Sequence, residues 1–367
     1  MSYSSTQFSG FSALFKIDLK LFVLVMLIVV IGLATLFSVS GGDINLITKQ
    51  LIRIAVGLTA MILLAQIHPD NFRLFSPFLY FFGIILLVLT IFFCVCISAD
   101  RWLDFYILRF QPSELMKLFI PLMIASFYSD KALPPKLKNL SIAVIIIVIP
   151  ALLIAKQPDL GTALLITSSG VIAIFLSGIK LAHIFLGTAL VIGAIPLLWS
   201  FMYEYQKSRV LSFFSPNTDA LGTGYHLAQS KISLGSGGLF GKGYMNGTQS
   251  QLDFLPENHT DFIFSAFGEE FGFVGVVILI SLYVLIALRG MSISIKATDN
   301  FSRILSATLI LTIFLYVLVN VGMVVGILPI VGAPLPFMSY GGTSMLTVFA
   351  ALGIIMSIKS HQRLMRK

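Results

Sequence analysis

Charged side chains are scarce in this sequence of 367 residues: Asp, Glu, Lys and Arg make up 11% of it, whereas hydrophobic residues make up 57%. Soluble globular domains carry about 25% charged residues. The apolar residues also come in long runs, close to the ~20 residues that a helix needs to cross a lipid bilayer. These proportions exclude a soluble globular protein and predict an all-α polytopic membrane protein.

Cysteine is almost absent, since Cys94 and Cys96 are the only two. They stand two residues apart inside an apolar run, so on a helix they point to different faces and cannot pair with each other. The sequence also lacks a GxxxxGK[ST] phosphate loop, an HExxH motif and a GxSxG motif. A disulfide framework is therefore excluded, and nothing indicates nucleotide hydrolysis or a cysteine-based metal centre.

The apolar runs predict ten spanning helices in a single domain, with a tail at 1–15 and a long polar loop at 204–260 between the seventh and eighth helices. Lys49 and Arg53 stand at the entrance of the second run. The predicted runs are 21–36, 51–67, 74–98, 113–128, 139–155, 160–177, 183–203, 271–288 and two within 304–358.

The basic residues predict which way the helices cross the membrane, because short cytoplasmic loops are enriched in Lys and Arg. This places both termini in the cytoplasm and the loop 204–260 outside. The net charge of +8 then reflects contact with anionic membrane lipids, and no nucleic acid is expected. The side holding the termini carries Lys16, Lys20, Arg73, Lys131, Lys136, Lys138, Lys180, Arg289, Lys296, Arg303, Lys359, Arg363, Arg366 and Lys367, against Lys49, Arg53, Arg101, Arg109 and Lys156 opposite.

Ionisable residues are concentrated at 252–275, immediately before an apolar run. Asp261 stands at the entrance of the eighth helix, where partial desolvation raises a carboxylate's pKa and favours general-base catalysis. A helix cap is the structural alternative for Asp261. We expect Glu257, His259 and Thr260 to support the turn, and Glu269 and Glu270 to pair with a basic residue.

Other polar groups fall on the same predicted side of the membrane, opposite the cytoplasm. Glu114 and Lys117 are three residues apart, so on a helix they share a face and form either an ion pair or an anion site. Arg101 and Arg109 either clamp a phosphate group or extend to the membrane interface. Asp159 is expected to cap the sixth helix while lining the site.

The stretch 320–344 interrupts the last apolar region with Pro329, Pro334, Pro336 and several glycines. Irregular backbone at membrane depth is tolerated only where it is buried or lines a cavity. The cluster that contains Ser339 and Tyr340 favours a cavity over an ordinary apolar loop.

Four motifs together resemble the SEDS family of shape, elongation, division and sporulation proteins, and its elongation branch more than its division branch. They are QPSELMK at 111–117, QPDLGT at 157–162, GGLFGKGYMNGTQSQLDFLPENHTDFIFSAFGEEFGFVG at 237–275 and the proline-rich stretch at 320–344. The resemblance covers nearly the whole chain.

The resemblance implies a peptidoglycan glycosyltransferase of the bacterial inner membrane that polymerises lipid II on the outer face. It implies Asp261 as the essential acidic residue, Lys117 with Glu114 in the substrate site, and a class B penicillin-binding protein as partner. The pyrophosphate leaving group calls for cations, either basic side chains or a divalent metal (Mg²⁺ or Mn²⁺). The alternatives are a lipid II flippase and a non-catalytic scaffold.

Overall fold

The computed structural model describes residues 16–93, 103–104, 109–157, 159–214, 223–251 and 258–362. Over these residues each predicted apolar stretch coincides with a helix. Cys94, Cys96 and the tail 1–15 lie outside them. The elements are α2 (Leu19–Val39), α3 (Ile44–Gln66), α4 (Pro69–Phe93), β1 (Leu103–Asp104), β2 (Arg109–Phe110), α5 (Pro112–Ser129), α6 (Leu137–Lys156), α7 (Leu160–Leu176), α8 (Leu181–Phe201), α9 (Glu204–Phe214), α10 (Thr223–Ser236), α11 (Thr248–Gln251), α12 (Ile263–Ile295), α13 (Asn300–Val325) and α14 (Thr343–His361).

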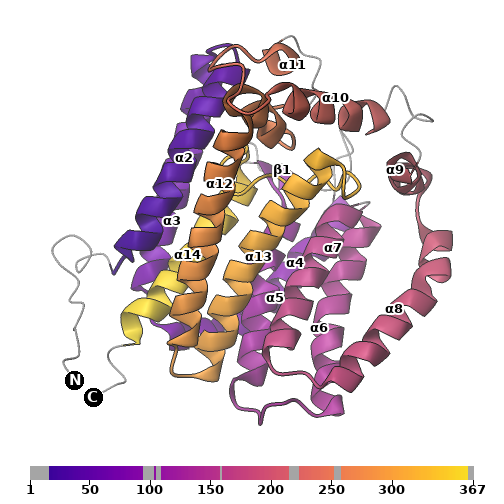
Figure 1. The fold of residues 1–367 in the computed structure, drawn as a ribbon. Coiled ribbons are helices and arrows are strands. Elements are labelled where there is room, and N and C mark those ends of the chain that lie inside the picture. The colour runs from indigo at the N-terminus through magenta and orange to yellow at the C-terminus, as the bar shows by residue number, and fades with distance from the viewer. Residues whose placement is uncertain are drawn as a thin grey trace.

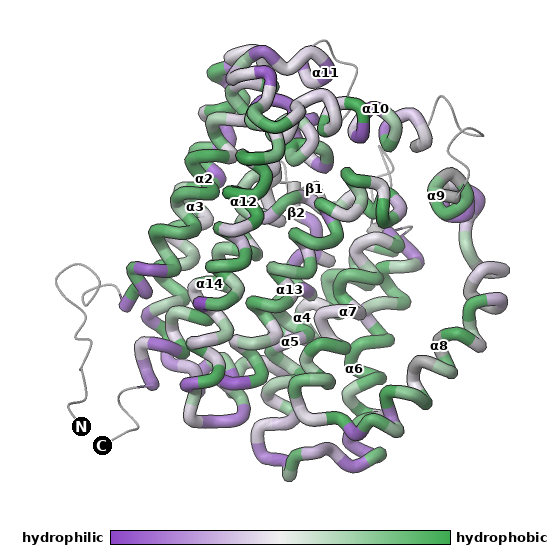
Figure 2. The backbone as a smooth tube through the Cα atoms, in the orientation of Figure 1, coloured by the Kyte–Doolittle hydropathy of each residue, from purple (hydrophilic) through white to green (hydrophobic). Residues whose placement is uncertain are grey.

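Seven of the described helices are long and apolar enough to cross a membrane: α2, α3, α4, α6, α12, α13 and α14. The helices α7 and α8 are shorter apolar helices. Hydrophobic residues follow the length of the bundle and hydrophilic residues gather at its two ends (Figure 2). The chain is therefore an integral membrane protein, and its division into ten crossings stays a prediction.

Helix α13 occupies the middle of the bundle, where it packs against α5, α7, α10, α12 and α14. Helix α14 packs along α3. Among the described helices α8 packs closely against none, and it stands apart from the bundle (Figure 1). The loop 204–260 carries the short helices α9, α10 and α11.

The helix α3 begins earlier than the sequence predicts. Asp43 caps it, accepting hydrogen bonds from the backbone N–H groups of Asn45 (2.8 Å) and Leu46 (3.4 Å). Arg53 follows Ile44 by nine residues, which places it roughly 13 Å along the helix axis. Arg53 stands at the start of the apolar run but well inside the helix, because the apolar run marks the hydrophobic part of the helix and not its capped start.

Buried ion pairs hold one end of the bundle, which we call the Asp18 end. Asp18 is 1% exposed, accepts from the Leu21 backbone N–H (2.8 Å) and pairs with Arg289 (2.7 Å) and Lys359. These contacts join the start of α2 to the late parts of α12 and α14. The start of α2 and the end of α14 therefore lie at the same end of the bundle.

The opposite end, which we call the Asp261 end, carries α10, α11 and the start of α12. Helix α12 bends at Gly272, whose φ is 66°. A β-carbon there would lie 2.2 Å from the Gly241 nitrogen, so the glycine-rich loop 238–243 contacts the bend through its backbone. The loop satisfies the groups that the bend frees, through Lys242 N–H to Glu269 O (3.0 Å), Gly243 N–H to Glu270 O (3.0 Å), Phe273 N–H to Gly238 O (2.9 Å) and Val274 N–H to Leu239 O (3.1 Å).

A non-helical segment, residues 326–342, separates α13 from α14, and we call it the break segment. Gly326 ends α13 in the left-handed conformation (φ 81°) that favours glycine. Within the segment Ala333 is 0% exposed, while Leu335 and Met338 are each 1% exposed. The predicted interruption is confirmed as irregular backbone, and its residues 335–339 are buried within the protein.

Candidate active site

Glu114 and Lys117 form a buried ion pair in the first turns of α5. Pro112 occupies the first position of the helix. Glu114 and Lys117 are three residues apart, so their side chains lie on one face of it. Lys117 Nζ lies 2.5 Å from Glu114 Oε1, and the two side chains are 10% and 6% exposed. The second oxygen of Glu114 accepts a hydrogen bond from Thr347 of α14 (3.3 Å). The predicted ion pair is confirmed, and its low exposure makes it more than a surface contact.

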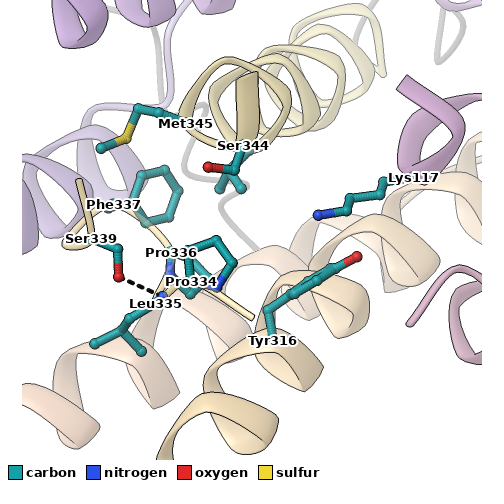
Figure 3. Close-up of a pocket in the computed structure, with 10 residues that line it drawn as sticks. Lys117, Tyr316, Pro334, Leu335, Pro336, Phe337, Ser339, Ser344 and Met345 are labelled. Carbon is teal, nitrogen blue, oxygen red and sulfur yellow. Dashed lines mark hydrogen bonds between the residues drawn. The ribbon is translucent and has the colours of Figure 1, made fainter. Parts of the chain in front are cut away.

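Lys117 also borders an open cleft. Its ammonium lies 4.5 Å from the centre of the Tyr316 ring, on α13. Figure 3 shows this ammonium pointing into the space between Tyr316, the prolines of the break segment and Ser344. The cleft contains about 350 Å³ of empty space. It is lined by Lys117, Tyr316, Pro334, Leu335, Pro336, Phe337, Ser339, Ser344, Met345 and Val348.

The segment that carries Asp261 is bound to the break segment. Tyr340 N–H donates to the His259 carbonyl (2.9 Å), and Ser339 Oγ donates to the Thr260 carbonyl (2.7 Å). A β-carbon at Gly332 would lie 3.5 Å from Asp261 Oδ2, so this carboxylate lies against the break segment. The N-cap position of α12 is Phe262. Asp261 therefore precedes the helix, and Ser339 and Tyr340 fix the turn before it.

Helix α13 connects Asp261 with Lys117. Asn320 Nδ2 donates to the Asp261 carbonyl (2.8 Å) and to the Ala333 carbonyl (2.7 Å). Tyr316, which contacts Lys117, lies four residues earlier, so the two side chains occupy consecutive turns of one helix face. Asp261 and Lys117 thus lie beside neighbouring positions of α13. The break segment also lies against Asp261 and lines the cleft beside Lys117.

Asp159 caps α7, as predicted, and it also holds the start of α5. Its Oδ1 accepts from the Thr162 N–H (3.1 Å) and its Oδ2 from the Thr162 hydroxyl (2.9 Å). Gln111, which immediately precedes α5, donates to Asp159 Oδ2 (3.1 Å). Asp159 therefore fixes the helix end from which Glu114 and Lys117 project.

Glu269 organises the loop above the site. Its side chain is 0% exposed and pairs with Lys242 (2.6 Å). The same carboxylate accepts from Ser233 Oγ (3.2 Å), Ser236 Oγ (3.4 Å), Thr248 Oγ1 (3.1 Å), Gln249 N–H (3.0 Å), Ser250 N–H (3.2 Å) and Ser250 Oγ (3.2 Å). The predicted pairing of Glu269 with a basic residue is confirmed. Glu270, 1% exposed, instead accepts from Ser38 of α2.

Helix α10 covers the turn that holds Asp261. Its Ser230 carbonyl accepts from the Ser265 hydroxyl (2.7 Å), and the Ser230 hydroxyl donates to the Val324 carbonyl (3.0 Å). The ring of His226 stacks on Phe262, with centroids 6.2 Å apart and an interplanar angle of 11°. The loop 204–260 thus contacts the start of α12 and the end of α13 together.

Some predicted site residues cannot be placed. Arg101 and Glu257 lie outside the described residues. The backbone of Arg109 forms β2, close before Gln111, but its side chain is not described. Among the described residues no group of three or more His, Cys, Asp and Glu side chains could hold a metal ion.

Sequence reasoning missed several residues that complete the site: Gln50, Arg53, Tyr316, Asn320 and Thr347. Tyr316 and Asn320 carried a usable signal, because they are polar residues at helical spacing within an otherwise apolar span. Arg53 carried another, as an arginine beside an apolar run. Gln50 and Thr347 gave none, since only helix packing brings Gln50 to Ser339 and Thr347 to Glu114.

The family model described as "Cell cycle protein", which covers FtsW, RodA and SpoVE, matches residues 12–364. This chain belongs to the FtsW/RodA/SpoVE family. It is 46% identical over 353 residues to the peptidoglycan glycosyltransferase MrdB of Escherichia coli (strain K12), covering 96% of this chain and 95% of that protein. It is 31% identical to the stage V sporulation protein E of Bacillus subtilis (strain 168), covering 94% and 98%.

Solved structures of family members share the fold. A chain of a peptidoglycan synthase complex, described as coordinating polymerisation and crosslinking, matches with a TM-score of 0.83 at 28% identity, covering 94% of this chain and 98% of that one. The rod shape determining protein RodA of Thermus thermophilus matches with a TM-score of 0.72 at 27% identity, covering 95% and 98%. The expected family is therefore confirmed across nearly the whole length.

Proposed function

We propose that this protein is a peptidoglycan glycosyltransferase that polymerises lipid II into β-1,4-linked glycan strands during cell elongation. The relative MrdB, which carries that activity in its name, aligns over 96% of this chain. The observation that carries the proposal is that Asp261 and Lys117 both lie beside one face of α13. A carboxylate and an ammonium flank neighbouring turns there, next to a cleft.

The reaction needs a base on one side of the sugar and positive charge on the other. The donor sugar is α-linked to undecaprenyl pyrophosphate, and the product linkage is β, so a single inverting displacement accounts for the stereochemistry. Asp261 takes the proton from the acceptor 4-hydroxyl while the oxygen of that hydroxyl bonds to the donor anomeric carbon. The electron pair of the broken bond leaves with the pyrophosphate, which needs no strong general acid.

Lys117 is the cation that we assign to the leaving pyrophosphate. It lines the cleft and sits in a site with little solvent, where a positive charge stabilises developing negative charge more than it does in water. Glu114 holds it in place, and Thr347 in turn donates a hydrogen bond to Glu114. Arg101, Arg109 and a divalent metal such as Mg²⁺ or Mn²⁺ are further sources of charge, and activity with and without a chelator distinguishes the metal from the arginines.

The polyprenyl tail requires a route from the bilayer. Helix α8 packs closely against no other described helix, and we propose that the tail enters on this side. The loop 204–260 would guide the growing glycan. A class B penicillin-binding protein is the proposed partner, in keeping with a related structure that belongs to a complex for polymerisation and crosslinking. We place the protein in the bacterial inner membrane, with both termini cytoplasmic and Asp261 facing outward.

Purified protein incubated with lipid II and its transpeptidase partner tests the function directly. We expect glycan strands that lengthen with time, detected by gel electrophoresis of labelled product. Transport of lipid II across vesicles without any glycan would identify a flippase instead. Stimulation of a separate polymerase, with no product from this protein, would identify a scaffold.

A further inference from the structure

Two polar residues of α3, Gln50 and Arg53, contact the break segment at a place that the proposed mechanism does not use. Gln50 is 2% exposed, and its Nε2 donates to the Ser339 carbonyl (3.2 Å). The Arg53 guanidinium lies over the Tyr340 ring, 4.1 Å from its centre. A β-carbon at Gly342 would lie 3.8 Å from Arg53 Nε. Both side chains therefore face the part of the break segment that fixes the turn before Asp261.

Each of these side chains keeps one buried atom without a partner. Arg53 Nη1 and Gln50 Oε1 are both shielded from solvent and make no hydrogen bond. Arg53 also forms no ion pair with any carboxylate among the described residues. It lies roughly 13 Å along α3 from the helix start, at a rise of about 1.5 Å per residue. Arg53 as a whole is only partly buried, but a cation within a membrane span that has no counter-charge indicates a functional role.

The two unpaired atoms indicate which hydrogen-bonding groups a ligand at this place would need. Arg53 Nη1 requires an acceptor, preferably an anion, because guanidinium groups match phosphate oxygens well. Gln50 Oε1 requires a donor from the same ligand, such as a hydroxyl or an amide N–H. The orientation of the Gln50 amide is fixed by its bond to the Ser339 carbonyl. A chloride ion offers no donor, whereas a phosphorylated sugar offers both an anion and a donor.

The position also fits such a ligand. Ser339 and Ser344 line the cleft that Lys117 borders, and Gln50 and Arg53 reach residues 339–342 from α3. Two cations therefore approach one short stretch of backbone from different helices, α5 and α3. A diphosphate group is long enough to be contacted by more than one cation, and the turn that carries Asp261 is bonded to the same stretch.

We propose that Arg53 and Gln50 form a second part of the substrate site. Arg53 binds a phosphate oxygen of a diphosphate-linked sugar, and Gln50 accepts a hydrogen bond from a hydroxyl or amide of that sugar. This inference rests on the proposed glycosyltransferase function and assigns to it a phosphate contact beyond Lys117.

The test compares the wild type with Arg53→Met, Arg53→Lys and Gln50→Glu in lipid II polymerisation, with Lys156→Ala as a control. Lys156 is an exposed cation at the same end of the bundle, in the last turn of α6. We expect Arg53→Met to raise KM for lipid II about tenfold to a hundredfold, the range of a lost hydrogen bond to a charged group. For Arg53→Lys we expect a KM between those of the wild type and Arg53→Met, because lysine keeps the positive charge but lacks the planar guanidinium group. Lys156→Ala leaves KM unchanged.

Gln50→Glu provides an independent arm with nearly the same shape. The new carboxylate pairs with Arg53 and repels a diphosphate, so we expect KM to rise at least as far as in Arg53→Met. Thermal unfolding separates this role from a structural one. A lower midpoint with an unchanged KM assigns Arg53 to folding and overturns the proposal.

Two further arms identify the source of the phosphate. Binding of undecaprenyl diphosphate to detergent-solubilised protein needs no turnover, and we expect Arg53→Met to weaken it. This arm still reports on Arg53 if the wild type makes no glycan, a result that would count against the proposed function alone. Activity in vesicles of phosphatidylcholine with and without phosphatidylglycerol tests the membrane. An effect of Arg53→Met that depends on phosphatidylglycerol, with unchanged diphosphate binding, assigns Arg53 to lipid headgroups and overturns the proposal.

Discussion

The two ends of the helical bundle both bury charged groups, but the buried polar atoms without a hydrogen-bond partner are concentrated at one end. At the Asp18 end, Asp18 is 1% exposed; it accepts a hydrogen bond from the Leu21 backbone N–H and forms ion pairs with Arg289 and Lys359. At the Asp261 end, buried atoms lack a hydrogen-bond partner on side chains from five different helices. They are Gln50 Oε1, Arg53 Nη1, Ser113 Oγ, His226 Nδ1, Gln229 Oε1, Glu270 Oε2, Tyr316 OH and Asn320 Oδ1. Among the described residues at the Asp18 end, His183 Nδ1 at the start of α8 is an exception.

This difference separates stability from function. An unpaired buried polar atom costs about 1–3 kcal/mol, so a group of them is retained where a ligand completes the bonds. The Asp18 end gains from its charges in the folded protein alone. We therefore expect substitutions at the Asp18 end to change stability and substitutions at the Asp261 end to change activity.

The largest expected effect is that of Asp261→Asn, which tests the contrast most directly. The polymerisation rate should fall by about 10²–10⁴-fold, the usual contribution of a general base. The fold should persist, because Asn320 bonds to the backbone carbonyl of Asp261 and not to its side chain. Single-turnover rates with lipid II measure the change. An unaltered rate would mean that another group takes the proton.

The next effect separates the two roles of Lys117. Lys117→Met leaves Glu114 buried and unpaired, so both activity and stability should fall, the latter by about 3–5 kcal/mol. The double variant Glu114→Gln with Lys117→Met removes both charges and should recover most of the stability while remaining inactive. Denaturation and polymerisation assays on the same samples give the comparison. Recovery of activity together with stability would reduce the pair to a structural role.

Asp18→Asn tests the opposite end. Removing this carboxylate leaves Arg289 and Lys359 without their counter-charge and weakens the cap of α2, so stability should fall by about 3 kcal/mol. Specific activity per folded molecule should stay within about twofold of the wild type, within the scatter expected of independent sites. Thermal unfolding and active-fraction measurements check this. A large loss of specific activity in fully folded protein would contradict the division between the two ends.

Glu269→Gln should have the smallest effect, because it removes one charge from a network that keeps its other donors. Loss of the Lys242 ion pair should cost about 1–3 kcal/mol locally and loosen the segment from Lys242 to Gln251. Faster proteolytic cleavage of this segment is the expected measurement, with Ser281→Ala, an exposed position on the same helix, as control. Unchanged protection would show that the neutral donors suffice.

Much of this organisation follows from the sequence. The apolar runs place the helices, Asp159 marks the start of α7, and the prolines and glycines at 320–344 mark the interruption between α13 and α14. The spacing of Glu114 and Lys117 predicts their contact, since the α-helix alone brings such residues together. Helix starts are less well predicted. The early beginning of α3 depends on the Asp43 cap, which lies outside the apolar run.

The apolar runs, the cap residues and the motifs therefore establish the membrane-protein class, the helices, the family resemblance and the prominence of Asp261. Which residues meet depends on the folded chain, where Asn320 contacts Asp261, Tyr316 contacts Lys117 and Arg53 contacts Tyr340. Helix periodicity fixes the neighbours within one helix, because it depends on local backbone geometry. Contacts between α3, α5, α13 and the break segment depend on how whole helices pack, which no local pattern specifies.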